Sequence, residues 1–459
     1  MTKRLPLVLA LAVAGCSLAP EYKRPAAPVP GAWPTTLDGK TTATKFSDDW
    51  KTFFTDSHLQ ALIAAALEHN RDLKIAVARV DEARALAGLA GADRFPTVDV
   101  NVQRQAALTP ADLSATGRPL SSQRYDANLG LAAFELDFWG RVKNLDDAAR
   151  ANFLASDYAR RAFRLTLIGD VASAWYGLRE LTERTALAEA TARNREESRR
   201  LVEKRRDAGL AGDLDFLAAD GAWAAARAEA ASLARQQAAA ENALRLLVGN
   251  NLAVSPEPSF SSTTAAISEI AVDLPSDVLL GRPDVLAAEQ KLIAANANIG
   301  AARAAFLPRI SLTAAAGSAS RALAGLFDSG SGAWSFVPLL KWPLFDAGRT
   351  AGNVDLAEAR KNIAVAEYEK TIQQAFREVA DLLAARDRYA EQLAALEAAA
   401  TAQGERLQRV EARHKAGVSS YLELLDAQRE HFAAQQSVLA TRRAWAATAA
   451  GLYKALGGA

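Results

Sequence analysis

The chain of 459 residues contains one cysteine and one methionine, and it carries almost no net charge. A single cysteine cannot form a disulfide within the chain, so we expect no internal covalent bridge. The 54 basic residues balance 53 acidic ones, and this balance gives no electrostatic reason to expect nucleic acid as a partner. Half of the residues are hydrophobic, which indicates a folded protein and not a disordered one.

Long apolar runs and catalytic motifs are also missing. Beyond residue 16 no apolar run is long enough for a membrane-spanning helix, so a membrane crossing by this part of the chain would require strands. The sequence has no phosphate loop, no serine-hydrolase motif and no isolated carboxylate pair. It therefore gives no support for an enzyme, a resident metal or a non-covalent cofactor. The histidines lack metal-ligand spacing and are scattered at His58, His69, His414 and His431.

The N-terminus has the features of an export signal. Lys3 and Arg4 precede a short apolar run over residues 5–14. The run ends in the letters VAGC, a pattern typical of a lipobox, in which Cys16 becomes the lipid-modified first residue of the mature chain. The following Ser17 stands where an aspartate would favour retention in the inner membrane, and it therefore favours sorting to the outer membrane.

Residues 1–15 are accordingly predicted to be a lipoprotein signal peptide. Residues 16–56 follow as a lipid anchor and a tether, because five prolines between residues 20 and 34 block both helix and sheet. The rest of the chain reads as two copies of one unit. A helical pattern over residues 71–96 returns 212 residues later at 283–308, and a Gly-Arg pair at residue 140 returns 208 residues later.

The repeat predicts the domain organisation. We expect a first repeat over residues 57–250, an inter-repeat linker over 251–275 and a second repeat over 276–459. Each repeat is predicted to contain a helix, two strands, a very long helix and a return helix. The strand pairs are expected near residues 98–103 and 125–137, and near 310–313 and 335–345.

Alternation of apolar and polar residues in these strands predicts a sheet with one apolar and one wet face. It is clean over residues 98–103 and less regular later, where Leu129, Leu131 and Phe134 are the apolar positions. Four strands cannot close a barrel, and open edges in lipid are costly. Several chains must then share one barrel. Two would supply eight strands, which their own side chains fill, whereas three would supply twelve and leave a channel.

The long helices are predicted over residues 142–208 and 350–416, which contain no proline. At 1.5 Å per residue each would measure about 100 Å, so they must pack side by side as a bundle or tube. Each run ends at a glycine, Gly209 or Gly417, which is a C-cap signal. A return helix of about 35 residues follows each turn. Its caps are expected among Asp213, Asp215, Ser419 and Ser420.

With these features the chain resembles the TolC-like outer membrane factor family, in its lipoprotein branch that serves resistance-nodulation-division efflux pumps. The resemblance covers nearly all of the mature chain. It is carried by the lipobox and by several separated motifs, LGRPD at 280–284, AFLP at 305–308, PLFDAGR at 343–349, AG at 416–417, YLELLDAQ at 421–428 and the echo FWGR at 138–141.

The resemblance implies a mainly α fold with a membrane β-barrel, in which long helical hairpins form a periplasmic tube and each chain adds four strands to a 12-stranded trimeric barrel. It implies a homotrimer that docks to a periplasmic membrane-fusion adaptor and, through it, to an inner-membrane transporter. The implied function is an exit duct for drugs or other small molecules, lipid-anchored and located in the outer membrane. No cofactor is implied besides the covalent lipid on Cys16.

The resemblance also implies a gate at the periplasmic ends of the helices. The matching positions in the second copy are Leu422 and Asp426, which lie four residues apart and so on one helix face. In a trimer Leu422 would form an apolar constriction, and three Asp426 side chains an acidic ring that favours cations. Asp213 and Asp215 are the nearest acids in the first copy. The turn residues expected to contact the adaptor are Gly209, Leu210, Gly417 and Val418.

Two other functions remain open at this point. A duct for protein or peptide secretion with an ABC transporter would share the fold, although the lipid anchor argues against it. A non-channel periplasmic lipoprotein scaffold would have long helices without a membrane-embedded sheet. For the gate itself, the plainest alternative is that Asp426 is an ordinary exposed helix acid.

Overall fold

The computed structural model describes residues 17–33, 50–250 and 276–457. The predicted signal peptide, Cys16 and the linker 251–275 lie outside the described residues. The chain forms two compact units, and each takes segments from both halves of the sequence. We call them the sheet unit, which holds Arg79–Asp157, Ala287–Glu369 and residues 17–26, and the hairpin unit, which holds the described parts of the remainder.

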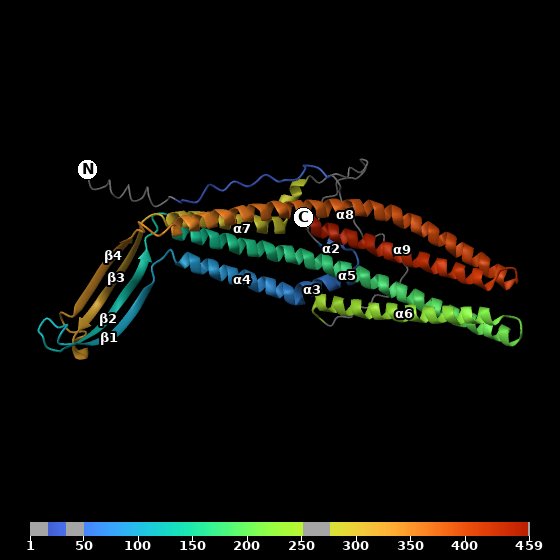
Figure 1. The fold of residues 1–459 in the computed structure, drawn as a ribbon, viewed down its shortest axis with the longest axis horizontal. Helices are drawn as coiled ribbons and strands as arrows, with labels where there is room; N and C mark the ends of the chain where they lie inside the picture. The colour runs from blue at the N-terminus through green and yellow to red at the C-terminus, as the bar shows by residue number, and fades with distance from the viewer. Residues whose placement is uncertain (1–16, 34–49, 251–275, 458–459) are drawn as a thin grey trace. The chain divides into compact units, whose positions relative to one another are not determined.

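Four strands form the sheet. They are β1 (Val98–Thr109), β2 (Leu120–Glu135), β3 (Arg309–Ser320) and β4 (Gly332–Lys341), all antiparallel and in the order β1-β2-β3-β4 (Figure 1). The four strands confirm the prediction, but the expected range 335–345 was wrong at its end. The strand runs from Gly332 to Lys341, where its pairing partner β3 begins at Arg309, and it includes Pro338, which an edge strand tolerates.

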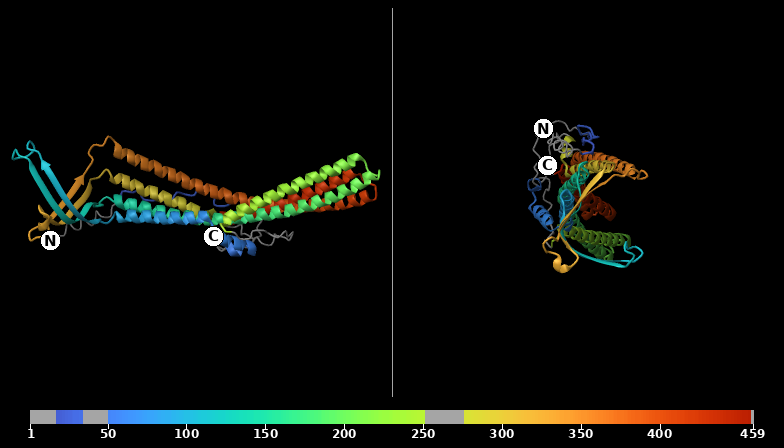
Figure 2. Two further views of the ribbon diagram at one scale, coloured as in Figure 1. Left: turned by 90° about the horizontal axis from the view of Figure 1, so that it is seen from below. Right: turned by 90° about the vertical axis from the view of Figure 1, so that its left-hand side faces the viewer.

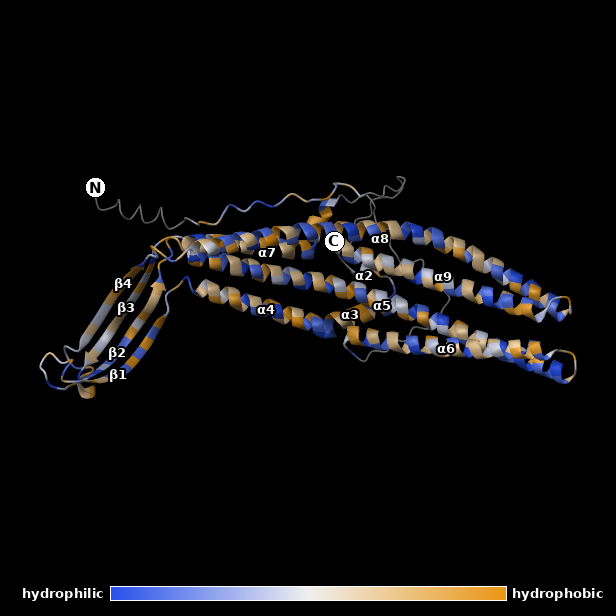
Figure 3. Cartoon of the chain, in the orientation of Figure 1, coloured by the Kyte–Doolittle hydropathy of each residue, from blue (hydrophilic) through white to orange (hydrophobic). Residues whose placement is uncertain are grey.

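The sheet has two chemically different faces. Directly paired residues in an antiparallel sheet point to the same side. One row across all four strands is Val100, Leu129, Ala316 and Trp334, and the adjacent row is Asn101, Asn128, Gly317 and Ala333. Figure 3 shows the resulting alternation of apolar and polar bands along β1. Val100 and Trp334 are 74% and 80% exposed, so nothing in the described chain covers the apolar row.

A β-bulge explains the irregular alternation in the second strand. The pairing of β2 with β3 shifts between Leu131 and Phe134, and Ala133 has a positive φ of 48°. The extra residue keeps Leu131 and Phe134 on the same face although their spacing is odd. It also brings Glu135 to the polar side, where Arg141 donates two hydrogen bonds to it, 2.8 and 2.7 Å long.

Helices lead into and out of the strands. They are α4 (Arg71–Ala92), α5 (Arg141–Asp207), α7 (Pro283–Ala304) and α8 (Arg349–Lys415). Both long helices begin after a glycine with positive φ, Gly140 at 70° and Gly348 at 83°, which explains the repeated Gly-Arg pair. A carboxylate just before that glycine accepts a backbone N–H of the first turn in each copy. The acceptor oxygens belong to Asp137 and Asp346.

The N-terminal segment runs along the helices of the sheet unit. Residues 17–33 form neither helix nor strand. Arg24 donates two hydrogen bonds of 2.6 Å to the buried Glu289 carboxylate of α7, and the Tyr22 hydroxyl donates a third. Nearer the start, the Ser17 hydroxyl donates to Asn144 of α5 over 2.8 Å. Residues 17–24 are therefore attached to α5 and α7.

The hairpin unit contains two long helical hairpins. The distal parts of α5 and α8 turn into α6 (Asp213–Val248) and α9 (Tyr421–Ala455), as Figure 2 shows. Near the turns all four helices share one apolar cluster, formed by Val202, Ala219, Val410, Tyr421, Leu424 and Ala427. No helix in the described part of the chain combines the length and the apolar character needed to cross a bilayer.

In both repeats a side chain caps the C-terminal end of the return helix. Asn70 lies between α3 (Ser57–His69) and α4, where its amide donates to the Leu247 carbonyl at the end of α6 over 2.8 Å. In the second repeat, Arg282 lies between a 3-10 turn, η2 (Ser276–Gly281), and α7, and donates to the Ala455 carbonyl at the end of α9. Both donors therefore satisfy a helix C-terminal carbonyl that would otherwise lack a partner.

Short elements complete the described chain. A one-turn helix, α2 (Trp50–Phe53), and a 3-10 turn, η3 (Leu323–Gly325), are the remaining ones. Phe53 and Phe54 pack against Tyr453 of α9, with ring centroids 5.1 and 5.6 Å away. These aromatic contacts anchor the segment before α3 to the C-terminal helix, so the start of the first repeat is fixed on the end of the second.

Candidate gate at the helical turns

The glycine caps predicted at the ends of the long helices are present. Gly209 and Gly417 have φ values of 72° and 76°, and the residue after each glycine donates a backbone hydrogen bond five residues back. Leu210 N–H reaches Arg205 and Val418 N–H reaches Arg413, at 2.7 and 2.9 Å. The N–H of each glycine also donates, to Arg206 and to His414. These two hydrogen bonds per turn make up the Schellman motif, which reverses the chain at a fixed residue.

The turn between α8 and α9 carries several further side-chain bonds. The Ser420 hydroxyl accepts a hydrogen bond from Glu423 N–H, so the prediction of a serine N-cap is confirmed. The Glu423 carboxylate in turn accepts one from the Ser419 hydroxyl. His414 Nδ1 lies 3.0 Å from the Ser419 carbonyl oxygen. Because a carbonyl can only accept, this nitrogen carries the proton.

The turn between α5 and α6 is more simply built. Its N-cap is Gly212, which offers no side-chain acceptor, so the prediction that Asp213 or Asp215 caps this helix was wrong. Both acids lie instead inside the first turn of α6, where a negative charge is favoured by the helix dipole. The connection between α5 and α6 therefore has fewer capping hydrogen bonds than the connection between α8 and α9.

Asp426 lies in the second turn of α9, between two arginines. Its carboxylate is 2.7 Å from Arg406 Nη2 of α8 and 2.9 Å from Arg429 Nη2 of α9. The Asp426 side chain is 40% exposed. The acidic charge at this position is therefore compensated within the chain, and the acidic ring remains a prediction.

Leu422 lies one turn before Asp426 and is 74% exposed. The turn residues Leu210 and Val418 are also exposed, at 79% and 69%. These three apolar side chains are therefore accessible to a partner at the turns. The gate and adaptor-contact residues named from the sequence are thus gathered at the turns, and their roles there remain predictions.

Sequence reasoning missed the two arginines that hold Asp426. Arg429 could have been found, since it lies three residues later on the same helix. Arg406 is on a different helix, but Arg406 and Asp426 each lie ten residues from Ala416 at the turn. Two helices that run antiparallel from one turn bring such positions opposite each other, so the register of the hairpin carried the signal.

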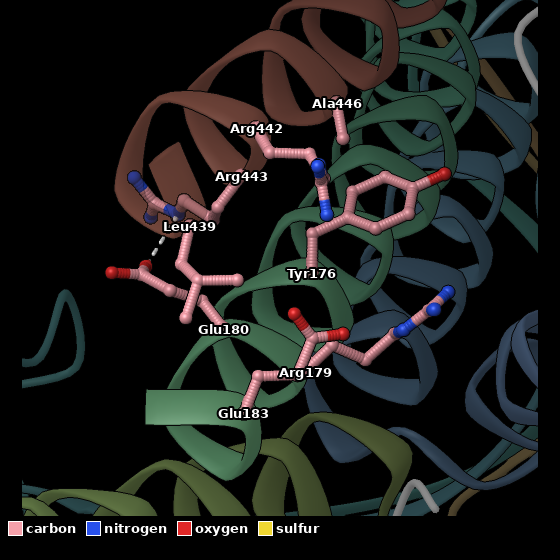
Figure 4. Close-up of a pocket in the computed structure, with 8 residues that line it drawn as sticks. All are labelled: Tyr176, Arg179, Glu180, Glu183, Leu439, Arg442, Arg443 and Ala446. Carbon is pink, nitrogen blue, oxygen red and sulfur yellow. Dashed lines mark ion pairs between the residues drawn. The ribbon is translucent and has the colours of Figure 1, made fainter. Parts of the chain in front are cut away.

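A small polar cavity lies between α5 and α9, away from the turns (Figure 4). Its volume of about 30 Å³ has room for one water molecule. Glu180 and Arg443 face each other across it at 4.0 Å. Burial raises the pKa of the neighbouring Glu183, and the charges of Arg179 and Arg442 offset only part of this effect. The cavity is thus a polar contact between helices and too small for a cargo molecule.

Metal ligands do not cluster in the described ranges 17–33, 50–250 and 276–457. No group of three or more His, Cys, Asp or Glu side chains there is arranged to hold an ion. The turns offer charged and apolar surface, including the Arg406–Asp426 pair and the exposed Leu422.

Comparison with known families agrees with this geometry. The family model described as outer membrane efflux protein matches residues 62–250 and 274–458. The chain belongs to the outer membrane efflux protein family. The two matched segments together cover most of the described hairpins and all four strands.

Curated relatives of this efflux family match over nearly their whole length. The solvent efflux pump outer membrane protein SrpC of Pseudomonas putida is 43% identical over 462 residues, covering 99% of this chain and 98% of the relative. The cation efflux system protein CusC of Escherichia coli K12 is 39% identical over 458 residues, covering 99% of both chains. The chain is thus an outer-membrane efflux channel protein by family.

Solved structures share the fold. A membrane protein from Pseudomonas aeruginosa superposes with a TM-score of 0.89 at 41% identity, covering 96% of this chain and 97% of that one. The open-state MtrE channel of Neisseria gonorrhoeae gives 0.82 at 34% identity, covering 96% and 98%. The prediction of a TolC-like fold with helical hairpins and four strands per chain is confirmed.

Proposed function

We propose that the chain is the outer-membrane exit channel of a tripartite efflux system and that three copies assemble around one pore. In this assembly the channel conducts small molecules passively from an inner-membrane resistance-nodulation-division transporter, through a periplasmic adaptor, to the outside. It performs no chemical reaction on them. Its relatives carry names that refer to solvent, toluene and cation efflux.

The observation that carries this proposal is the two-faced sheet. Its apolar row, which includes Val100 and Trp334, is exposed, and the adjacent row of Asn101 and Asn128 is polar. The end strands β1 and β4 each pair on one side only among the described residues. An apolar face suits lipid and a polar face suits a wet pore, but open edges do not suit a bilayer. Further copies of the same sheet remove both edges and leave a pore inside.

The turns support the proposed gate and adaptor contact. The exposed apolar side chains Leu210 and Val418 lie beside the glycines that reverse the chain, where a partner protein can reach them. Leu422 and the Arg406–Asp426 pair stand on the next turns of the second hairpin. We place the constriction there, with Asp213 and Asp215 at the corresponding end of the first hairpin.

The lipid anchor is part of the same proposal. Cys16 is the only cysteine of the chain, and the described segment begins at the next residue, Ser17, which is bonded to Asn144 of α5. The hydrogen bonds of Ser17, Tyr22 and Arg24 hold the segment after Cys16 on α5 and α7, which supports an anchored N-terminus.

The test is the conductance and mass of the purified full chain. We expect discrete conductance steps in planar lipid bilayers and a mass in detergent of three chains after subtraction of bound detergent. Mass spectrometry of the mature N-terminus should show acyl groups on Cys16, and Cys16→Ser should remove them without removing conductance.

Two outcomes would favour the alternatives. A water-soluble monomer without conductance would indicate a periplasmic scaffold and would end the channel proposal. A conducting trimer that restores peptide secretion with an ABC transporter, and leaves drug resistance unchanged, would indicate the secretion duct instead.

A further inference from the structure

A groove of about 630 Å³ lies in the hairpin unit among α5, α8 and α9. Its volume falls in the range of sites for small organic ligands. Apolar side chains make up much of the wall, including Leu187 and Leu201 of α5 and Phe432 of α9. The groove has more than ten times the volume of the one-water cavity between α5 and α9, so it can hold a small organic molecule.

One wall of the groove carries an arginine without a counter-ion. Arg195 of α5 donates one hydrogen bond from Nη1 to the Ala222 carbonyl, 3.0 Å away. Its Nε is buried and has no hydrogen-bond partner among the described residues. Burial lowers the pKa of Arg195, and the Tyr421 phenol opposes this only in part. One turn further along, Arg199 is paired with Asp220 at 2.5 Å, so pairing is the rule nearby and Arg195 departs from it.

A second buried nitrogen faces the same groove. His431 of α9 lines it, and its Nδ1 also lacks a hydrogen-bond partner in the described chain. The imidazole is held close to α8, because a Cβ at Gly404 would lie 3.2 Å from its Cε1. Buried polar atoms in native proteins are nearly always satisfied, so the Arg195 Nε–H, which can only donate, points to a missing acceptor, and His431 Nδ1 marks a second polar position without a partner in the described chain.

The charged residues that line the groove indicate which class of ligand would supply that acceptor. A desolvated guanidinium without a carboxylate is unfavourable, and a bound anion would compensate it. Water could bond to Arg195 Nε but would leave its charge unpaired. Glu197 and Glu411 also line the groove, and they make no ion pair with Arg195. Arg205 and Lys415 line it too, so the wall carries three cations against two acids, a balance that suits a ligand with a single negative charge.

We propose that this groove binds an amphipathic organic anion, with a single carboxylate or sulfonate on Arg195 and an apolar body along Leu187 and Phe432. The proposal goes beyond the conducting role of the channel and does not depend on it. Since α5, α8 and α9 all contribute to the groove, an occupant would link the two hairpins near their turns.

A pair of fluorescent probes tests the proposal with the full chain in lipid nanodiscs. 8-Anilinonaphthalene-1-sulfonate carries the anion, and N-phenyl-1-naphthylamine has the same rings without it. We expect saturable binding of the sulfonate above the signal of empty nanodiscs. Arg195→Gln should weaken it about ten- to hundred-fold, as loss of a charged hydrogen bond does, while binding of the neutral amine should not change.

Arg193→Gln is the matched control. It removes the same charge from the same helix two residues earlier, but the Arg193 side chain is 68% exposed, so sulfonate binding should stay as in the wild type. Arg195→Lys should give an intermediate affinity, which a misfolded variant would not. Equal losses for Arg193→Gln and Arg195→Gln would overturn the proposal. Absence of saturable sulfonate binding by the wild type would also overturn the proposal.

Discussion

The sharpest prediction concerns the pair that joins α8 to α9 near the turn. Arg406 and Asp426 are 2.7 Å apart, and their side chains are 42% and 40% exposed. We expect Asp426→Ala to shift the channel toward its open state, because this pair holds the two helices of the second hairpin together. Arg406→Ala should act in the same direction, since it removes the same bond.

The size of the effect follows from the exposure of the pair. An exposed ion pair contributes about 0.2–1 kcal/mol. If three copies open together, the three pairs amount to about 0.6–3 kcal/mol, or roughly a three- to hundred-fold change in the ratio of open to closed channels. Arg429 also pairs with Asp426, but both lie on α9. Arg429→Ala should therefore change the ratio less.

Open probability and conductance in planar bilayers measure the effect, with sensitivity of cells to large antibiotics as a second readout. Glu430→Ala is the control, because in the described part of the chain Glu430 pairs with Arg429 of its own helix, at 3.2 Å, and with no residue of α8. The double variant at Arg406 and Asp426 should open no further than either single one. Unchanged conductance on Asp426→Ala, or an equal change on Glu430→Ala, would remove Asp426 from the gate.

Three further predictions address the rest of the chain. Asn70→Ala should lower the free energy of unfolding by about 2–3 kcal/mol, because it removes the bond to the Leu247 carbonyl and the one that the Asn70 side-chain oxygen accepts from Leu73 N–H. Thermal unfolding measures the loss, and Asn70→Asp, which keeps the acceptor oxygen, should recover part of it. Val100→Arg should impair membrane insertion by about 2–4 kcal/mol, whereas Asn101→Arg on the polar face should insert normally, as heat-modifiability on gels would report. Glu183→Gln should raise thermal stability at neutral pH. The pKa of Glu183 is raised in the folded state, so ionisation of this carboxyl destabilises the fold above that pKa. The stability gained by the substitution should therefore vanish when the solution is acidified. Equal stability of wild type and Glu183→Gln at every pH would contradict this reasoning.

Much of the architecture follows from local sequence alone. The two long helices were expected over 142–208 and 350–416 and lie at Arg141–Asp207 and Arg349–Lys415. Proline-free runs bounded by glycine are enough to place them, since helix propensity and capping act over a few residues. The turns at Gly209 and Gly417 were placed for the same reason, as both need a positive φ.

Strand ends and some caps depended on information that local patterns do not carry. The second strand begins at Leu120 and not near residue 125, because β1 continues to Thr109 and supplies a pairing partner for each added residue. The odd spacing of Leu131 and Phe134 breaks the alternation in the sequence, and the bulge between them explains it. Whether an extra residue is absorbed by a bulge depends on the neighbouring strand, which the sequence of one strand does not specify.

The sequence by itself determined the repeat, the helix lengths, the turns and the two-faced character of the strands, because each of these arises from residues close together in the chain. Only the tertiary structure decided which distant groups meet. Arg406 beside Asp426, Asn70 on the Leu247 carbonyl and the unpaired Arg195 in its groove all depend on how helices pack. Charge compensation and burial are properties of such contacts, and they decide what a gate residue or a binding groove can do.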